Sequence, residues 1–286
     1  MTTMRTFLGI GAQKAGTTAL TRFLANHPEV YVPAIKEMHF FDLVDDEKNT
    51  RKRLTDDIRR RYRRLELAYK RNGDMETVMA EIRAITDRFA VGHDPEKYRE
   101  MLMQGPTGTR ICGEFTPAYA VMNPQKIARI AQVLDRPRIL FILRNPADRF
   151  LSQVSHAQTH LARDQDRGES PLEMLKRPGL SARSDYNKTL RSLDGVFPAE
   201  DVFIGFFEDL VGPDAPDMHK RICTFLDIDP APAADVPAGK PVTPRPCNAD
   251  VRDALVQRFA PAYRMVQDRM GTLPQTWQDD LKRAGL

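Results

Sequence analysis

The chain has 286 residues, of which 41% are hydrophobic and 29% are charged, a balance typical of a globular protein and not of a disordered or fibrous one. Its 43 Lys and Arg residues exceed its 39 Asp and Glu residues by four, which is too small an excess to require a nucleic-acid partner. This charge suits a small anionic ligand if basic side chains converge in one cleft.

The apolar runs are short, and none approaches the roughly 18–20 residues that cross a bilayer. The first residues show no signal-peptide pattern. The three cysteines, Cys112, Cys223 and Cys247, form neither a metal-binding pattern nor a disulfide framework, although a Cys223–Cys247 bridge stays open as an alternative. We therefore expect a cytoplasmic protein without a membrane or nucleic-acid partner.

Continuous apolar runs predict parallel strands, because a strand covered on both faces shows no alternation. The runs lie at residues 6–11, 29–32 (the weakest), 109–112, 138–143 and 201–206. Residues 18–26 have helical spacing of apolar side chains and follow the first run. Strands that alternate with helices predict an α/β fold with a central, mostly parallel sheet and a ligand at the carboxyl ends of the strands.

The composition changes in a segment of about residues 45–105. Its first part is dense in charge with sparse apolar positions, which predicts two solvated helices within residues 45–89, inserted after the second strand. This insertion is an exposed excursion or, alternatively, a contact surface for an acceptor or for a second copy of the chain. The Pro-rich residues 230–246 predict a long loop, and residues 248–271 predict one amphipathic helix, interrupted or kinked near Pro261. We expect a single domain over residues 1–286.

Residues 11–18, GAQKAGTT, are the strongest motif and stand between the first strand and the first helix. Glycine-rich loops let backbone N–H groups surround an anion, and the helix N-terminus favours negative charge. The nucleotide P-loop pattern GxxxxGK[ST] has lysine where this chain has Thr17, whereas Lys14 stands in mid-loop. Arg144, not an acidic residue, follows the strand at 138–143. A phosphate-like ligand is therefore expected, and a P-loop kinase or NTPase is the weaker alternative.

Five motifs resemble, in the same order, those of the sulfotransferases that use 3′-phosphoadenosine 5′-phosphosulfate (PAPS). They are the 5′-phosphosulfate loop at residues 7–20, KEMHFFD at 36–42, GEFTPAY at 113–119, RNPADRFLS at 144–152 and FFEDL at 206–210. The second resembles the KExHFFD element of the heparan-sulfate-type branch, and the fourth the RNPxxRxxS motif for the 3′-phosphate. The resemblance implies a P-loop-like, three-layer fold and a bacterial, soluble member of that branch.

The resemblance also implies roles for individual residues. Glu37 is the expected catalytic base, and Lys14 is expected to stabilise the leaving 5′-phosphate. Lys36 and His39 are expected to contact the acceptor, although His39 could instead be a buried, hydrogen-bonded histidine. Arg149 is either a phosphate contact or a structural residue.

The expected cofactor contacts come from four parts of the chain. They are Lys14, Ala15, Gly16, Thr17, Thr18 and Ala19 in the phosphate loop, Arg144 and Ser152 at the 3′-phosphate, Tyr186 in a GxY-like segment, and Lys240 in the Pro-rich loop. Thr17 or Thr18 should also cap the following helix. The expected cofactor is PAPS, with 3′-phosphoadenosine 5′-phosphate (PAP) as product, and no metal.

The reaction implied is transfer of a sulfuryl group to a hydroxyl or amine of a small-molecule or carbohydrate acceptor. Phe115 replaces the lysine that many heparan-type enzymes carry in the EKTPxY segment, which weakens a heparan-like assignment. A catalytically inactive PAP-binding protein is the second alternative. A homo-oligomer built through the charged insertion is a further expectation.

Overall fold

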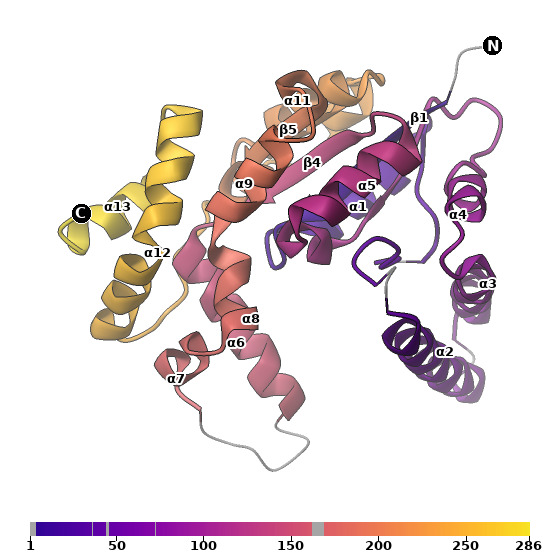
Figure 1. Ribbon diagram of the computed structural model, residues 1–286, viewed down its shortest axis with the longest axis horizontal. Coiled ribbons are helices and arrows are strands. Elements are labelled where there is room, and N and C mark those ends of the chain that lie inside the picture. Colours follow the sequence, from indigo (N-terminus) through magenta and orange to yellow (C-terminus); the bar gives the residue numbers. More distant parts are fainter. Residues whose placement is uncertain (1–3, 36, 44–45, 72, 162–168) are drawn as a thin grey trace.

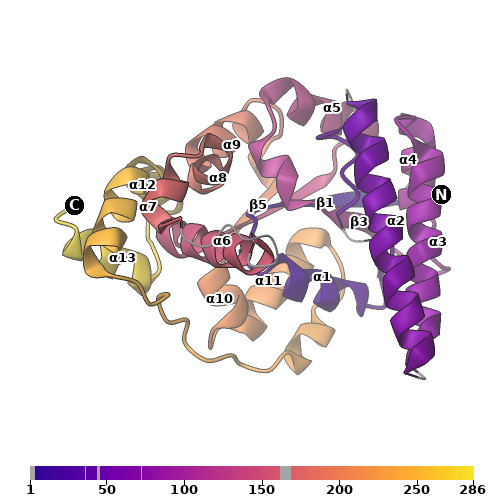
Figure 2. The ribbon, with the colours of Figure 1, turned by 90° about the horizontal axis from the view of Figure 1, so that it is seen from below.

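The computed structural model describes residues 4–35, 37–43, 46–71, 73–161 and 169–286. Within them, five parallel strands form one sheet in the order β2-β3-β1-β4-β5 (Figure 1). The strands are β1 (Arg5–Gly11), β2 (Val30–Tyr31), β3 (Ile111–Phe115), β4 (Arg138–Leu143) and β5 (Val202–Phe206). Helices α1 and α11 cover one face of the sheet and α5 and α9 the other (Figure 2). The predicted three-layer α/β fold is confirmed.

The helices around the sheet follow its strands in alternation. They are α1 (Thr17–Ala25), α5 (Pro124–Leu134), α6 (Pro146–Leu161), α7 (Pro171–Leu175), α8 (Pro178–Ser181), α9 (Tyr186–Asp194), α10 (Phe207–Val211) and α11 (Ala215–Leu226), with 3-10 turns η1 (Pro117–Val121), η2 (Ala182–Ser184), η3 (Ala199–Asp201) and η4 (Ala231–Asp235). Helix α5 illustrates why they form, because Asn123 caps its first turn and its apolar residues are buried on one face.

Strand β3 extends further than the sequence predicted, since the run at residues 109–112 gave no signal over Gly113 and Glu114. Both are buried in the sheet. A Cβ on Gly113 would lie 2.2 Å from Phe7 Cδ1, and a Cβ on Gly9 would lie 1.9 Å from Phe115 Cδ1. The two glycines therefore make room for the two rings, whose centroids are 5.6 Å apart. Each glycine thus accommodates the phenylalanine ring of the other strand, and these two contacts pack β1 against β3.

The two helices predicted within residues 45–89 are confirmed as the first two of three helices that the described residues form between β2 and β3. They are α2 (Glu47–Lys70), α3 (Met75–Val91) and α4 (Pro95–Leu102). Helix α2 buries only Thr50 and Leu54, so its many charged side chains face solvent or its neighbours. Helix α3 packs along α2 and sends the fully buried Arg88 toward the sheet. Helices α3 and α4 therefore attach the insertion to the core, through buried side chains such as Ile85 and Tyr98, whereas α2 buries little.

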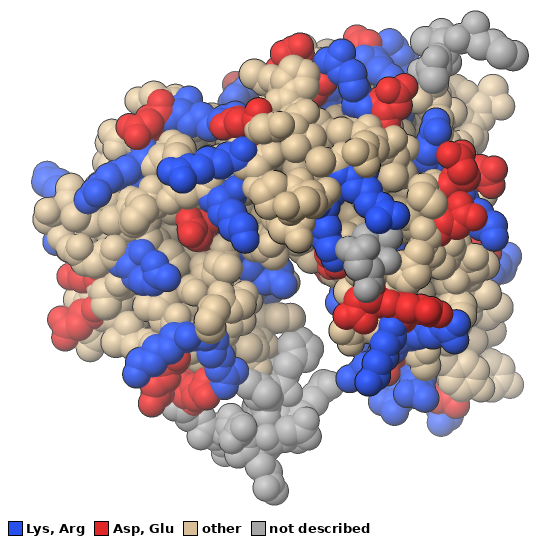
Figure 3. Space-filling view, in the orientation of Figure 1, with Lys and Arg blue, Asp and Glu red and all other residues tan. Residues whose placement is uncertain are grey.

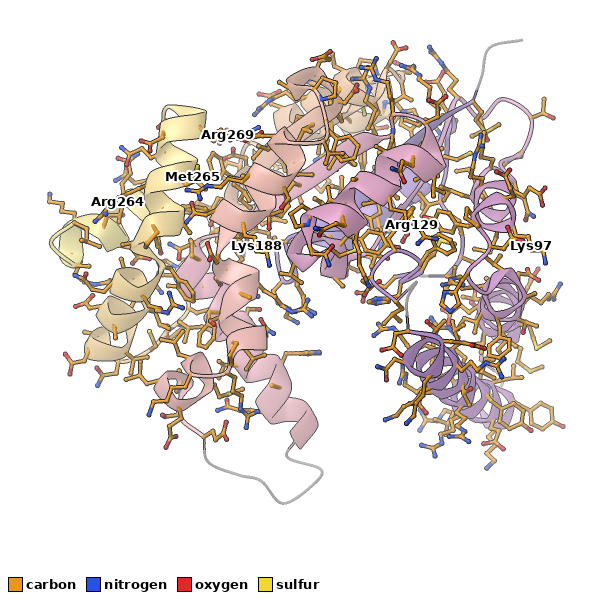
Figure 4. All side chains as sticks on the ribbon, in the orientation of Figure 1. Lys97, Arg129, Lys188, Arg264, Met265 and Arg269 are labelled. Atoms are coloured by element: carbon orange, nitrogen blue, oxygen red, sulfur yellow. The ribbon has the colours of Figure 1, made fainter. Side chains whose placement is uncertain are left out.

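The C-terminal part consists of a loop after η4 and the helices α12 (Ala249–Met270) and α13 (Gln275–Arg283). The single helix predicted here is confirmed without an interruption, because α12 continues through Pro261 with the buried Phe259, Ala260, Ala262 and Tyr263 on both sides of the proline. Arg269 of α12, labelled in Figure 4, pairs with Asp194 of α9 at 2.7 Å.

The sequence did not predict α13. The alternative disulfide does not form, since Cys223 is buried, Cys247 is exposed and both are free. Among the helices of the described residues, none is long and apolar enough to cross a membrane.

Candidate functional site

The phosphate loop, residues 11–18, joins β1 to α1 at the carboxyl edge of the sheet. Lys14 and Gly16 adopt left-handed φ angles of 70° and 78°. A Cβ on Gly16 would lie 2.9 Å from Phe207 Cδ2, so both the backbone and the packing require glycine there. The carbonyl oxygen of Ala12 accepts a hydrogen bond from the buried Ala15 N–H at 3.1 Å, which closes the turn.

The predicted cap of α1 is wrong. The helix begins at Thr17, so Thr17 and Thr18 lie inside it and Gly16 is the N-cap residue. Gly16 has no side chain, and no side chain of the described residues caps this helix. The helix dipole favours an anion at this end, although the Ala19 N–H already donates to the Gly16 carbonyl oxygen at 2.9 Å. Thr17 is buried, whereas Thr18 and Ala19 are exposed.

Arg144 follows β4 directly and reaches the phosphate loop of the neighbouring β1. Its Nη1 donates to the carbonyl oxygen of Lys14 at 2.8 Å, and its guanidinium carbon lies 4.5 Å from the centre of the Phe207 ring. Only 9% of Arg144 is exposed, and its buried Nε has no hydrogen-bond partner among the described residues. Burial lowers the pKa of Arg144. A cation this poorly solvated is well suited to bind an anion.

Tyr186 is buried and holds the backbone of Arg144 through two hydrogen bonds. Its hydroxyl donates to the Arg144 carbonyl oxygen at 2.6 Å and lies 3.3 Å from the Arg144 N–H, which donates to it. Tyr186 is 1% exposed. The residue therefore fixes the backbone of Arg144, and its direct contact with a cofactor stays a prediction.

A buried polar network holds the turn that follows Arg144. The Asn145 Nδ2 donates to Asp280 at 2.7 Å, and the Asn145 Oδ1 accepts from Tyr263 at 2.9 Å. Arg252 of α12 donates to Asp280 at 2.6 Å and to Asp148 at 2.8 Å. The two C-terminal helices thus anchor the RNP turn, a role that no local sequence signal indicated.

Glu208 belongs to the FFEDL motif and faces the same turn. Its Oε1 accepts from the Asn145 N–H at 3.1 Å and from Trp277 Nε1 at 2.9 Å, while its buried Oε2 has no partner in the described part of the chain. Burial raises the pKa of Glu208 to about 7. The motif therefore marks a buried acid beside Arg144.

Ser152 and Arg149 lie on α6, which starts just after Arg144. Ser152 is 5% exposed. Arg149 is fully buried; its Nη1 donates to Gln153 at 2.6 Å and its Nη2 to the Leu180 carbonyl oxygen at 3.2 Å. Because these contacts tie α6 to α8, the structural alternative for Arg149 is favoured.

The Pro-rich loop returns to the site at Arg245. Lys240 is exposed and follows Gly239, whose N–H donates to the Gly212 carbonyl oxygen at 2.8 Å. The Arg245 N–H instead donates to Asp148 at 2.9 Å, and its positive charge contributes to the lowered pKa of Arg144 after burial. The basic residue that approaches Arg144 is therefore Arg245, which sequence reasoning missed because the loop offers two cations and no periodic pattern.

Glu37 lies in a tight segment between β2 and α2, with a left-handed φ of 59°. Its Oε2 lies 3.3 Å from His39 Nε2, and the other ring nitrogen, Nδ1, lies 2.6 Å from Asp42. His39 is 5% exposed. Burial opposes protonation of His39, but the two carboxylates outweigh it and raise its pKa. Both ring nitrogens are engaged, which favours the buried-histidine alternative over the predicted acceptor contact. Lys36 lies outside the described residues.

The GEFTPAY motif fixes this segment from the end of β3. Glu114 is 1% exposed and accepts hydrogen bonds from the Met38 N–H at 3.3 Å and from the Tyr119 hydroxyl at 2.7 Å. The Tyr119 hydroxyl accepts in turn from the Phe40 N–H at 3.0 Å. Arg88 of α3 donates to the Met38 carbonyl oxygen at 3.0 Å. These residues shape the backbone beside Glu37 without reaching the ligand side.

The strand order brings the phosphate loop, the Glu37 segment and Arg144 to neighbouring strands of the sheet. β1 lies between β3, which carries the support of the Glu37 segment, and β4, which carries Arg144. The Thr116 N–H donates to the Gly9 carbonyl oxygen at 3.0 Å, so the ends of β3 and β1 are in direct contact. Among the described residues, no group of three or more His, Cys, Asp or Glu side chains could hold a metal.

A central strand that leads into a glycine-rich anion loop, flanked by a strand-end arginine, defines a P-loop-like α/β transferase. The family model described as "Sulfotransferase family" matches residues 7–232, and the chain therefore belongs to the sulfotransferase family, whose members transfer a sulfuryl group. The predicted family is confirmed, and the predicted kinase or NTPase alternative is wrong.

Two solved structures share this fold. A sulfotransferase from Alicyclobacillus acidocaldarius is 23% identical with a TM-score of 0.66, covering 96% of this chain and 98% of that one. The sulfotransferase domain of the curacin biosynthetic pathway is 16% identical with a TM-score of 0.52, covering 91% and 98% respectively. None of the curated proteins matches this sequence.

Proposed function

We propose that the sulfuryl donor is PAPS and that this enzyme releases PAP. The observation that carries the proposal is the hydrogen bond from Arg144 Nη1 to the Lys14 carbonyl oxygen, 2.8 Å long. It joins the mid-loop lysine to the strand-end arginine, the two features that separate this chain from ATP-binding P-loops. A kinase lysine would stand at the position of Thr17.

The residues present fit such a cofactor. The uncapped first turn of α1 and the glycine cradle at Gly16 suit the 5′-phosphate group, with Lys14, Ala15, Thr17, Thr18 and Ala19 around it. The buried Nε of Arg144 lacks a partner among the described residues and suits the 3′-phosphate, with Ser152 beside it on α6. Arg245 joins this group in place of Lys240, and Tyr186 acts through the backbone of Arg144.

PAPS supplies the activated sulfuryl group when bound. Lys14 holds positive charge next to the oxygen that takes up negative charge as the sulfuryl group departs. Glu37 removes the proton from the acceptor hydroxyl or amine, and His39, held by Asp42 at 2.6 Å, orients the Glu37 carboxylate. Preorganised side chains of this kind lower the barrier without further rearrangement.

The acceptor is a small molecule, and the KEMHFFD segment favours the heparan-sulfate-type branch and hence a carbohydrate. Lys36, adjacent to Glu37, is assigned to the acceptor side. The proposal treats residues 1–286 as one sulfotransferase domain, in which residues 45–105 form a helical insertion and residues 230–286 cover the cofactor.

The test is calorimetric titration with PAP and with ADP, each with and without Mg²⁺. We expect tight, metal-independent binding of PAP that exceeds binding of ADP, because only PAP carries the 3′-phosphate. Arg144→Ala should weaken PAP binding at least a hundredfold and ADP binding little. Arg144→Lys is the matched control, since it keeps the positive charge but loses the planar guanidinium group. Its affinity for PAP should lie between those of the wild type and Arg144→Ala. Equal binding of ADP and PAP would refute the proposal.

A further inference from the structure

Two arginines outside the cofactor site approach Glu37 from different elements. Arg53 of α2 has its Nη2 3.6 Å from the Glu37 Oε2. Arg183 of η2 is half-buried, and burial lowers its pKa while the nearby Glu37 and Asp42 carboxylates act against this. The charge of Arg53 also acts on Arg183. Arg53 therefore contacts Glu37, and Arg183 lies within electrostatic reach of the same carboxylate.

Both guanidinium groups carry an N–H without a partner. The Nε of Arg53 and the Nη1 of Arg183 are buried, and neither has a hydrogen-bond partner among the described residues. A buried donor of a charged group destabilises the protein unless an oxygen accepts from it. Oxygen atoms of a bound ligand would satisfy both donors.

The surface beside Arg53 has room for such a ligand. A cavity of about 360 Å³ lies along α2, with three cations and one carboxylate in its lining: Leu43, Asn49, Lys52, Arg53, Asp56 and Arg60. In the space-filling view the molecule is hollowed between α2 on one side and α6 and α8 on the other (Figure 3). The charged insertion thus forms one wall of the approach to Glu37.

Neutralisation of Glu37 alone does not account for this arrangement. Arg53 is close enough to balance the charge of Glu37, and His39 already bridges Glu37 to Asp42. Arg183 is a further, half-buried cation, and Lys52 and Arg60 line the cavity beside Arg53, where Arg60 pairs with Asp57. These carboxylates nevertheless leave the buried Nε of Arg53 and Nη1 of Arg183 without an acceptor among the described residues.

We propose that Arg53 and Arg183 bind a negatively charged group of the acceptor, a carboxylate, sulfate ester or phosphate ester, next to the hydroxyl or amine that Glu37 deprotonates. The oxygen atoms of this group accept from the two orphaned N–H groups. The inference rests on the proposed role of Glu37 and adds the chemical class of the acceptor: an acid, recognised by the helical insertion.

The experiment uses inorganic sulfate as the probe on the protein saturated with PAP, so that the cofactor's two phosphate sites are filled. Sulfate replaces chloride at constant ionic strength, and binding is followed by calorimetry and by the shift in thermal unfolding. Arg53→Gln and Arg183→Gln each remove one guanidinium. Arg63→Gln is the matched control, since it removes one positive charge from an exposed site on the same helix.

We expect saturable binding of sulfate to the wild type and to Arg63→Gln, and about tenfold weaker binding to each of the other two variants. All four proteins should bind PAP with similar affinity, which shows that they are folded. Sulfate binding that is absent, or equal in all four proteins, would overturn the inference while leaving the PAPS proposal intact. Failure of the wild type to bind PAP would instead overturn the proposed function itself.

Discussion

The substitution Arg252→Met tests how the C-terminal helices hold the cofactor side of the site. Arg252 donates to Asp280 through two nitrogens, at 2.6 and 2.7 Å, and to Asp148 at 2.8 Å. The side chains of both aspartates are 2% exposed. Methionine fills similar volume but leaves two buried carboxylates without their shared cation, a change that typically costs about 3–5 kcal/mol.

The remaining donors reduce this cost. Asp148 keeps the Arg245 N–H at 2.9 Å, and Asp280 keeps Asn145 at 2.7 Å and Arg283 at 2.9 Å. We therefore expect a loss of about 3 kcal/mol in the free energy of unfolding, at the lower end of the range for a broken buried pair. Since domains are stable by about 5–15 kcal/mol, this is a large fraction of the total.

Urea denaturation followed by tryptophan fluorescence measures the loss. Trp277 is the only tryptophan, is fully buried, and lies on α13 one turn before Asp280. Arg283→Met is the control, because Arg283 also contacts Asp280 but is 43% exposed and should cost less than about 1 kcal/mol. A loss for Arg252→Met no larger than that of the control would refute the reasoning.

Two further substitutions test the cofactor side. Gly16→Ala places a Cβ 2.9 Å from Phe207 at a φ of 78°, and PAP affinity measured by calorimetry should fall more than about tenfold. Gly108→Ala, with a φ of 98° and nothing within 4 Å, should leave that affinity unchanged, and equal effects would contradict the packing argument. Glu208 has a pKa raised from 4.5 to about 7, so the folded state favours its protonated form, and stability should fall by up to about 3 kcal/mol as pH rises from 5 to 8. Glu208→Gln should remove that part of the slope in unfolding measurements, and an unchanged slope would show that other groups cause it.

Local motifs were enough to predict the strands and the phosphate loop, because continuous apolar runs and the glycines at 11 and 16 indicate the backbone structure of the segments in which they lie. The support of Glu37 was not predictable in this way. Glu114 and Arg88 reach it through hydrogen bonds between residues 76 and 50 positions apart. A pattern read along the chain carries no signal for such contacts.

The Pro-rich loop shows the same limit. Lys240 and Arg245 are equivalent cations in the sequence, whereas in the structure the Arg245 N–H donates to Asp148, 97 positions away in the chain. Likewise, Pro261 predicts an interruption or a kink, but α12 is continuous, with buried side chains on either side of the proline. Tertiary packing overrides local preference at both places.

The central place of β1 in the sheet has a consequence for how the protein is made. Both of its neighbours follow late, since β1 ends at Gly11 and β3 and β4 begin at Ile111 and Arg138. A ribosome that adds about 5–20 residues per second needs on the order of 5–20 s to cover that first interval. During this time β1 has been synthesised, but its neighbours β3 and β4 have not. The loop translated first is thus among the last to take its working shape.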